Sequence, residues 1–318
     1  MLDTYISAAL RPSLWRRLRD QAIDPAAAAP AARWFAALWA LAALVLLARA
    51  HGGQVLNSTI VLAGTLVFCA LTALTTEPPA DALVTAPGPR RRLWVQAAIA
   101  LLFAAITGYT ALAFHQLIPR EAAAIPLWTP LVGWFGALGE RYLPVEIVGS
   151  PSNVVANPLR YFVLPLIALL LAGARPRDLG FGRGHRSWRV IALWCAIPAL
   201  IWAILLASGG LTLDRLGRRL LSNAFQNGFF EEFLFRGALQ TRLAALWGGG
   251  WALVAQALLF GLWHLGADTR LMDGDPLAGL AATVVIQGTM GLGWGFIFQR
   301  TRNLLAPSVF HVVSNTIG

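Results

Sequence analysis

Long apolar runs alternate with short polar segments along most of the chain. A helix that crosses the hydrocarbon core of a bilayer needs about 20 mainly apolar residues, within a range of roughly 17 to 25. This rule predicts an all-α fold, a polytopic membrane helix bundle of about eight or nine transmembrane helices. The predicted spans are residues 34–48, 55–74, 93–117, 159–172, 190–207, 220–243, 251–265, 277–298 and 304–317.

Two further segments have a mixed character. Residues 1–33 place four arginines beside Leu14, Trp15 and Leu18, which fits either a helix lying in the membrane interface or a flexible tail. Residues 119–158 contain tryptophans and several prolines, and we expect an extramembrane or half-inserted segment there. Without an internal repeat or a low-complexity linker, the chain is expected to form one membrane domain with an N-terminal accessory part.

The composition agrees with lipid as the solvent. Hydrophobic residues make up 57% of the 318 residues and charged residues only 13%, whereas a soluble domain carries roughly 25% charged residues. The formal charge is +10, and all 25 basic residues are arginine. These arginines lie between apolar runs, a pattern typical of orientation in a bilayer rather than of nucleic-acid binding. Arginine without lysine, beside abundant Ala and Gly, suggests GC-rich coding and hence a bacterial source, with the protein in the cell (inner) membrane.

Arginine positions also predict the orientation. With the N-terminus inside the cell, 16 arginines near span ends face the cytoplasm, Arg242 among them, and 8 face outward, Arg160 among them. Arginine is enriched on the cytoplasmic side of membrane proteins. We therefore expect the N-terminus and the loop of residues 175–189 to be cytoplasmic.

Only two of the fifteen carboxylates, Glu231 and Glu232, lie in the middle of a predicted span. A carboxylate in lipid costs about 2.5 to 3.5 kcal/mol even on insertion scales, so function is the default hypothesis for it. The alternative is a structural ion pair that holds two helices together. Glu232 and Arg236 have the i, i+4 spacing of such a pair. Glu231 points away from them.

Glu231 aligns instead with Asn227 and Asn223 at steps of four, which predicts a polar stripe facing a wet cavity or polar partners. Two histidines lie in other predicted spans. His264 follows Phe260 by one helical turn, and His311 shares a helix face with Asn315 because the two are four residues apart. A single intramembrane histidine is more often a packing residue than a catalyst, so these residues gain weight only as a set.

Three motifs occur in order. Residues 231–236 read E-E-x-x-x-R, residues 260–264 read F-x-x-x-H, and residues 311–315 read H-x-x-x-N. Together they resemble the motifs of the CPBP family of intramembrane peptidases, also called the CAAX protease and bacteriocin-processing or Abi family. Residues 288–307 are similar to the glycine-rich penultimate helix and turn of that family. The resemblance covers about the last hundred residues and implies a glutamic endopeptidase related to type II CAAX prenyl proteases.

The chemistry of the motif residues agrees with this resemblance. Peptide hydrolysis needs a base for the attacking water and donors for the oxyanion. Glu231 is the candidate base, and His264 would help to hold or deprotonate the water. His311 and Asn315 are the candidate oxyanion donors. We expect Glu232 and Arg236 to support the motif helix, Phe260 to form a wall of the site, and Gly291 and Gly295 to let the last two helices approach closely.

The sequence divides into an N-terminal segment (1–33), accessory transmembrane helices (34–188) and a catalytic core resembling the CPBP family (189–318). The expected partners are the lipid bilayer and a membrane-associated protein or peptide substrate, with no nucleic acid. A prenylated substrate is not expected from a bacterium.

Two alternatives to this peptidase remain open. A zinc-dependent variant is one, because two His and a Glu can bind zinc. The H-E-x-x-H spacing is absent, however, so we expect that no cofactor is required. A non-catalytic protein of the same family, acting in bacteriocin immunity or binding, is the other. A transporter would show duplicated broken helices, which are not evident in the sequence.

Overall fold

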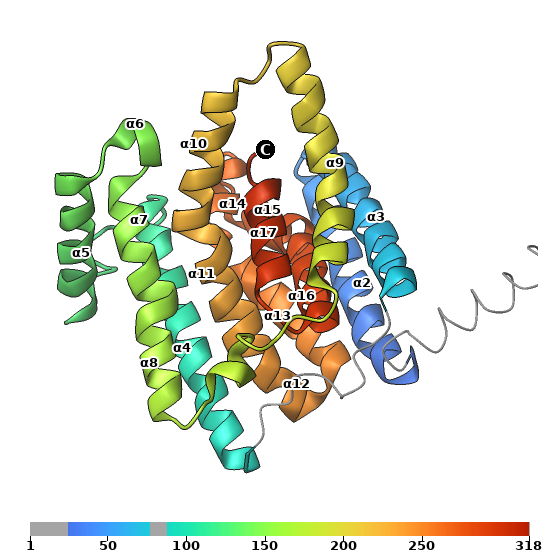
Figure 1. The fold of residues 1–318 in the computed structure, drawn as a ribbon, viewed down its shortest axis with the longest axis horizontal. Coiled ribbons are helices and arrows are strands. Elements are labelled where there is room, and N and C mark those ends of the chain that lie inside the picture. Colours follow the sequence, from blue (N-terminus) through green and yellow to red (C-terminus); the bar gives the residue numbers. More distant parts are fainter. Residues whose placement is uncertain (1–24, 77–87, 318) are drawn as a thin grey trace, which may run out of the picture.

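A computed structural model describes residues 25–76 and 88–317 (Figure 1). The regular structure in these two ranges is helical, which confirms the predicted all-α membrane bundle. The prediction of an interfacial or flexible N-terminal segment falls largely on residues 1–24, which lie outside the described residues. Residues 25–33 form the first turns of α2 (Pro25–Ala48).

Six helical stretches of the described chain are long and apolar enough to cross a membrane. They are Pro30–Ala48 in α2, α3 (Gly52–Thr75), α4 (Arg90–Phe114), Pro151–Leu171, α9 (Ser187–Ala207) and Pro276–Thr301. A seventh exists if α13 (Gly249–Trp263) and α14 (Leu265–Leu271), which meet at a 60° bend, form one broken span. The count of six or seven is lower than the eight or nine expected from the sequence.

The two counts differ because some of the predicted spans are helices that are covered by other helices or are too short to count as candidate spans. The predicted span 220–243 belongs to one continuous helical run, the motif helix, made of α10 (Leu213–Asn223), η3 (Ala224–Gly228), α11 (Phe229–Glu232), η4 (Phe233–Gln240) and α12 (Thr241–Trp247). Its charged residues make it less apolar than a lipid-facing helix, and every residue from 231 to 244 is buried in protein. The predicted span 304–317 contains only the ten-residue α17 (Leu305–Ser314).

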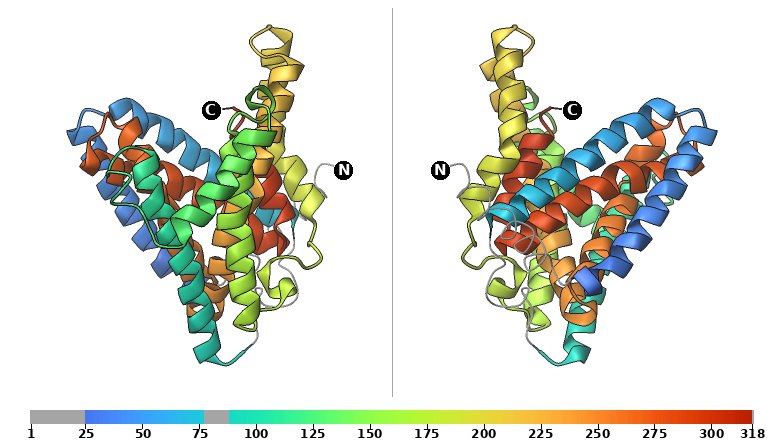
Figure 2. Two further views of the ribbon diagram at one scale, coloured as in Figure 1. Left: turned by 90° about the vertical axis from the view of Figure 1, so that its left-hand side faces the viewer. Right: turned by 90° about the vertical axis from the view of Figure 1, so that its right-hand side faces the viewer.

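The motif helix runs through the middle of the molecule (Figure 1). It packs against α4, α13, α17 and the stretch formed by α7 (Pro151–Pro158), η1 (Leu159–Val163) and α8 (Leu164–Leu171). In side view the bundle has a V-shaped outline, with α2 in one arm and α8 and α10 in the other (Figure 2). α13 packs against both α2 and the motif helix and thereby connects the two arms.

Segment 119–158 is largely helical. It contains α5 (Trp128–Tyr142), the short α6 (Val145–Val148) and α7. α5 packs on α7 at one edge of the molecule (Figure 1). Because α7 continues into η1 and α8, its residues belong to a candidate membrane span rather than to a loop.

The two motif glycines lie on α16 (Thr289–Thr301), which follows α15 (Pro276–Ala282) and η5 (Thr283–Gly288). A Cβ on Gly291 would lie 3.1 Å from Ala257 Cα, and one on Gly295 would collide with Gln256. The glycines therefore do allow close helix approach. The sequence analysis expected α17 as the partner of α16, but the helix that approaches is α13. The close contact brings α13 and α16 together behind the motif helix.

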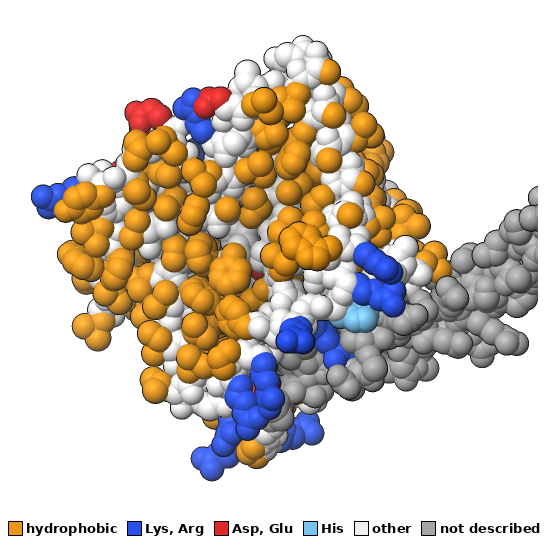
Figure 3. Space-filling model, viewed as in Figure 1, with side chains coloured by type: hydrophobic (Ala, Val, Ile, Leu, Met, Phe, Trp, Pro, Cys, Tyr) orange, Lys and Arg blue, Asp and Glu red, His pale blue; other side chains and the backbone are white. Residues whose placement is uncertain are grey.

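Arginine side chains gather toward one end of the face shown in Figure 3, near α12 and the connection between α8 and α9. Two arginines counted for orientation are not at span ends: Arg242 is fully buried, and Arg160 lies within the Pro151–Leu171 span. Removing one residue from each set leaves 15 against 7. The arginine bias still favours a cytoplasmic N-terminus, which stays a prediction.

Candidate functional site

The two glutamates lie on α11, a single α-helical turn between two π-helical segments, η3 and η4. π-Helix accounts for well under 1% of residues in proteins and occurs often at functional sites. The wider turn also changes which side chains share a face. Asn227 and Glu231 line one cavity, whereas the Asn223 amide donates to the Arg219 carbonyl oxygen at 2.9 Å. The predicted stripe of three residues is therefore reduced to two in the cavity.

Glu232 is fully buried and has two partners. Arg236 Nη1 lies 3.1 Å from Glu232 Oε1, and both side chains have no solvent exposure. His311 Nδ1 lies 2.8 Å from the same oxygen. The i, i+4 pairing of Glu232 with Arg236 is thus as predicted, and the carboxylate also connects the motif helix to α17.

Arg236 and His311 are held by aromatic rings. The Arg236 guanidinium lies 4.5 Å from the Phe260 ring centroid, and the His311 ring stacks on Trp294 with centroids 3.9 Å apart and an interplanar angle of 12°. Arg236 Nη2 also donates to the Gly291 carbonyl oxygen at 3.3 Å. These contacts fix the imidazole plane, so that its other nitrogen, Nε2, lies 3.8 Å from Glu231 Oε2.

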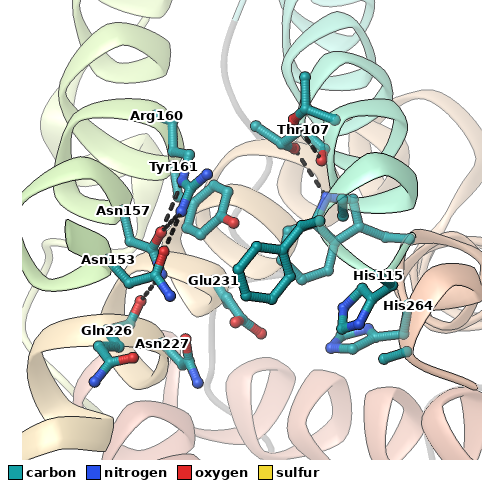
Figure 4. A pocket seen from close by; sticks show the side chains of 15 residues that line it. Thr107, His115, Asn153, Asn157, Arg160, Tyr161, Gln226, Asn227, Glu231 and His264 are labelled. Atoms are coloured by element: carbon teal, nitrogen blue, oxygen red, sulfur yellow. Dashed lines mark hydrogen bonds between the residues drawn. The ribbon is translucent and has the colours of Figure 1, made fainter. Parts of the chain in front are cut away.

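Glu231 faces a cavity of about 260 Å³ (Figure 4). Its side chain is 6% exposed, and within the described chain Oε2 has no hydrogen-bond partner. Most of the polar side chains around it come from other elements. Those lining the cavity are Thr107, Thr110, His115, Asn153, Asn157, Arg160, Tyr161, Gln226, Asn227 and His264.

His264 lies at the 60° bend between α13 and α14. Its Nδ1 is 2.9 Å from the Phe260 carbonyl oxygen. Because a carbonyl oxygen only accepts, Nδ1 carries the proton, and Nε2 of the neutral ring is an acceptor. The bend thus places a basic nitrogen on a ring that lines the same cavity as Glu231.

One wall of the cavity was missed by the sequence analysis. Asn153, Asn157, Arg160 and Tyr161 come from α7 and η1, at the junction of the segment predicted to be extramembrane or half-inserted and a predicted span. The signal was present as the spacing i, i+4 and i+7 of Asn153, Asn157 and Arg160, which places the three on one helix face.

His115 was not among the candidate residues of the sequence analysis. It follows the last residue of α4, yet it lines the cavity on the same side as His264 (Figure 4). Gly266 makes this possible, because a Cβ there would lie 2.9 Å from the His115 ring. A pattern within one helix contains no information about such a contact between α4 and α14.

Of the motif residues, only Glu231 and His264 line the cavity. Phe260 packs one layer behind its wall, between Arg236 and His264, whose ring centroid is 4.5 Å away. Asn315 lies at the end of α17, where its backbone N–H donates to the His311 carbonyl oxygen at 3.1 Å. Side-chain contacts within the described chain connect Glu231, Glu232, Arg236, Phe260, His264 and His311 but do not include Asn315.

Metal ligation was considered for the same residues. Among residues 25–76 and 88–317, no group of three or more His, Cys, Asp or Glu side chains has the arrangement of a metal site. Glu231 and His311 approach each other, but His264 reaches the cavity from a different side.

Comparison with known families agrees with the motifs. Residues 216–317 match the family model described as Type II CAAX prenyl endopeptidase Rce1-like. This match confirms the resemblance found in the sequence and is consistent with the CPBP family. It includes every motif residue but not α4, α7 or η1. Comparisons with curated proteins and with solved structures gave no significant match. At the level of the family, the C-terminal third of the chain is similar to membrane endopeptidases.

Proposed function

We propose that the protein is an intramembrane endopeptidase that hydrolyses a peptide bond of a membrane-associated protein or peptide. Glu231 is the base that activates water. The observation that supports this most strongly is the contrast between the two glutamates. Oε1 of Glu232 is held by Arg236 and His311, and this side chain does not line the cavity, whereas the Glu231 carboxylate faces the polar cavity and its Oε2 accepts no hydrogen bond.

The proposed first step is attack of water on the scissile carbonyl carbon. Glu231 accepts the proton of the water as the new C–O bond forms, and the carbonyl π electrons move to oxygen. His264 Nε2 accepts a hydrogen bond from the same water and orients it. The protonated Glu231 then gives its proton to the leaving amine as the C–N bond breaks.

The tetrahedral oxyanion needs donors, which are worth about 2.7 to 4 kcal/mol each in other hydrolases. His311 is the first candidate as an imidazolium, which would donate from Nδ1 to Glu232 and from Nε2, on the side of Glu231, to the oxyanion. Asn315 was the second candidate from the sequence. Asn227 is better placed, because its amide lines the cavity one turn before Glu231.

The remaining motif residues hold this arrangement in place. Glu232 and Arg236 tie the motif helix to α16 and α17 through the Gly291 carbonyl oxygen and His311. No metal is required in this mechanism, and a zinc-dependent variant remains the alternative that chelation tests. We further propose a bacterial inner-membrane location, a cytoplasmic N-terminus, and division into accessory helices (34–188) and a catalytic core (189–318).

The experiment compares peptides in the membranes and culture medium of cells that carry the natural protein or Glu231→Gln. It needs no prior choice of substrate. Glu121→Gln is the matched control, because Glu121 is exposed in a turn far along the chain from the motifs. We expect cleavage products that disappear with Glu231→Gln and persist with Glu121→Gln. Identical peptide sets in all three strains would favour the non-catalytic binding or immunity role.

A further inference from the structure

Arg160 is a charged residue in a membrane-spanning segment that the proposed mechanism does not use. It lies in η1, within the Pro151–Leu171 span, and its side chain lines the cavity opposite the two histidines (Figure 4). A charge at this depth is costly, and charged residues within spans usually face a cavity and serve function. Arg160 therefore requires a physical explanation.

Neutral side chains hold the guanidinium. Arg160 Nε donates to Asn157 Oδ1 at 2.7 Å, and Nη2 donates to Asn153 Oδ1 at 2.9 Å. Asn157 is fixed from its other end, because its amide donates to the Gln226 carbonyl oxygen at 2.7 Å. The Tyr161 ring centroid lies 5.1 Å from the guanidinium carbon. The charge is thus positioned by neutral side chains, while the Glu231 carboxylate of the same cavity interacts with it only beyond ion-pair distance.

Ion pairing distinguishes Arg160 from Arg236. Arg236 lies 3.1 Å from Glu232. Among the described residues, no carboxylate oxygen lies within 4.0 Å of an Arg160 nitrogen, the distance that defines an ion pair. Glu231, the acid of the same cavity, has His311 as its ion-pair neighbour. A neutral donor could cross-link the two asparagines at lower cost, so the retained positive charge points to an anionic ligand.

We propose that Arg160 binds a carboxylate of the substrate and thereby determines which peptide bonds reach Glu231. The planar guanidinium presents its donors in a fork that matches a carboxylate. Its fixed orientation lowers the entropic cost of binding. The carboxylate is either the C-terminal α-carboxylate of the peptide or an Asp or Glu side chain near the scissile bond. This assignment rests on the proposed function, because it concerns the substrate of the peptidase, but it is tested by peptide binding and not by cleavage.

Binding is measured on the full-length Glu231→Gln protein in detergent, so that cleavage does not deplete the probe. The probe is a synthetic library of ten-residue apolar peptides in three matched forms. The first has a free C-terminal carboxylate, the second a C-terminal amide, and the third a C-terminal amide with one Glu placed at each position in turn. Retained peptides are quantified by mass spectrometry.

We expect the carboxylate-bearing forms to be retained about 10 to 100 times more strongly than the neutral amides, as for a hydrogen-bonded charge pair. Enrichment of the first form identifies the α-carboxylate, and enrichment of the third identifies a side chain. With Arg160→Gln added, the carboxylate-bearing peptides should be retained less than about 3 times more strongly than the neutral amides. Arg160→Lys should retain part of it. The exposed Arg120→Gln should leave it unchanged.

Carboxylate forms retained no better than amides overturn the proposal, and this result needs no Arg160 variant. Equal loss of charged and neutral peptides in a folded Arg160→Gln protein also overturns it, because Arg160 would then only hold α7 against η3. Cleavage of library peptides by the natural protein is followed in parallel. Carboxylate preference without cleavage contradicts the proposed function alone, and cleavage without preference contradicts the role of Arg160 alone.

Discussion

Glu231 and Glu232 are neighbours in sequence, but they lie in two different regions of the molecule. On the Glu232 side, every nearby element contributes a partner: Arg236 from the motif helix, His311 from α17 and the aromatic residues that hold them. On the Glu231 side, the neighbouring polar groups surround a cavity instead of closing on the carboxylate. The same residue type is thus structural where an ion pair and a histidine enclose it, and chemically available where it faces a cavity.

The largest effect that would sharpen this comparison is expected from Glu231→Gln. The substitution keeps the size of the side chain and removes the proton acceptor, so cleavage should fall by about 10² to 10⁴-fold. Thermal stability should hardly change, because Glu231 Oε2 accepts no hydrogen bond and its ion-pair neighbour His311 is 3.8 Å away. Turnover of an identified substrate and melting in detergent are measured together. If Glu231→Gln unfolds the protein while its folded fraction cleaves normally, the carboxylate is structural.

Arg236→Ala tests the other side of the comparison. It leaves Glu232 buried without its cation, and breaking such a pair costs about 3 to 5 kcal/mol. We expect a large loss of folded protein and a lower Tm, with Arg120→Ala as the exposed control. Cleavage per folded molecule should fall as well, because His311 loses a fixed neighbour. An Arg236→Ala protein with the natural Tm would show that the closed side does not stabilise the bundle.

The third prediction compares the two residues of the last motif. His311→Ala should lower turnover by roughly 10² to 10³-fold if Nε2 stabilises the oxyanion. Asn315→Ala should lower it by less than about 10-fold, because its side chain, unlike that of His311, contacts neither glutamate in the described chain, and one lost neutral hydrogen bond is worth about 1 kcal/mol. Rates are compared for protein of equal folded fraction. Equal losses would place Asn315 at the reacting carbonyl group after all.

The smallest effect is expected from metal removal. Glu231 and the histidines supply a base and donors, so dialysis against a strong chelator should change the cleavage rate by less than about 2-fold. A calcium-loaded chelator serves as the matched control. Abolished cleavage that zinc alone restores would establish the zinc-dependent variant.

Sequence patterns were sufficient for features carried by one helix. The charged pair in an apolar run predicted the motif helix, and the i, i+4 spacing predicted the contact between Glu232 and Arg236. The family motifs added His264 and His311 to the same site. These predictions succeeded because burial of charge and helical spacing act over a few residues.

Features that depend on contacts between helices could not be predicted in the same way. The wall formed by Asn157 and Arg160 was divided between a segment predicted to be extramembrane or half-inserted and a predicted span, and His115 reaches the cavity from α4. Asn315 caps α17 in α-helical backbone conformation, and its N–H donates to the His311 carbonyl oxygen at 3.1 Å, so the four-residue spacing is kept. Its part in catalysis stays a prediction.

Four π-helical segments, η1, η3, η4 and η5, interrupt otherwise α-helical stretches, and η1 and η3 contribute residues to the cavity wall. Each α-helical residue turns the chain by about 100°. Removing one residue from η3 would therefore rotate α10 about the motif axis relative to Glu231, without altering any functional side chain. In this site, the number of residues between two side chains determines the angle between them about the helix axis, so it matters as much as which residues they are. Insertions and deletions that leave every motif intact should consequently be less tolerated within these segments than many substitutions.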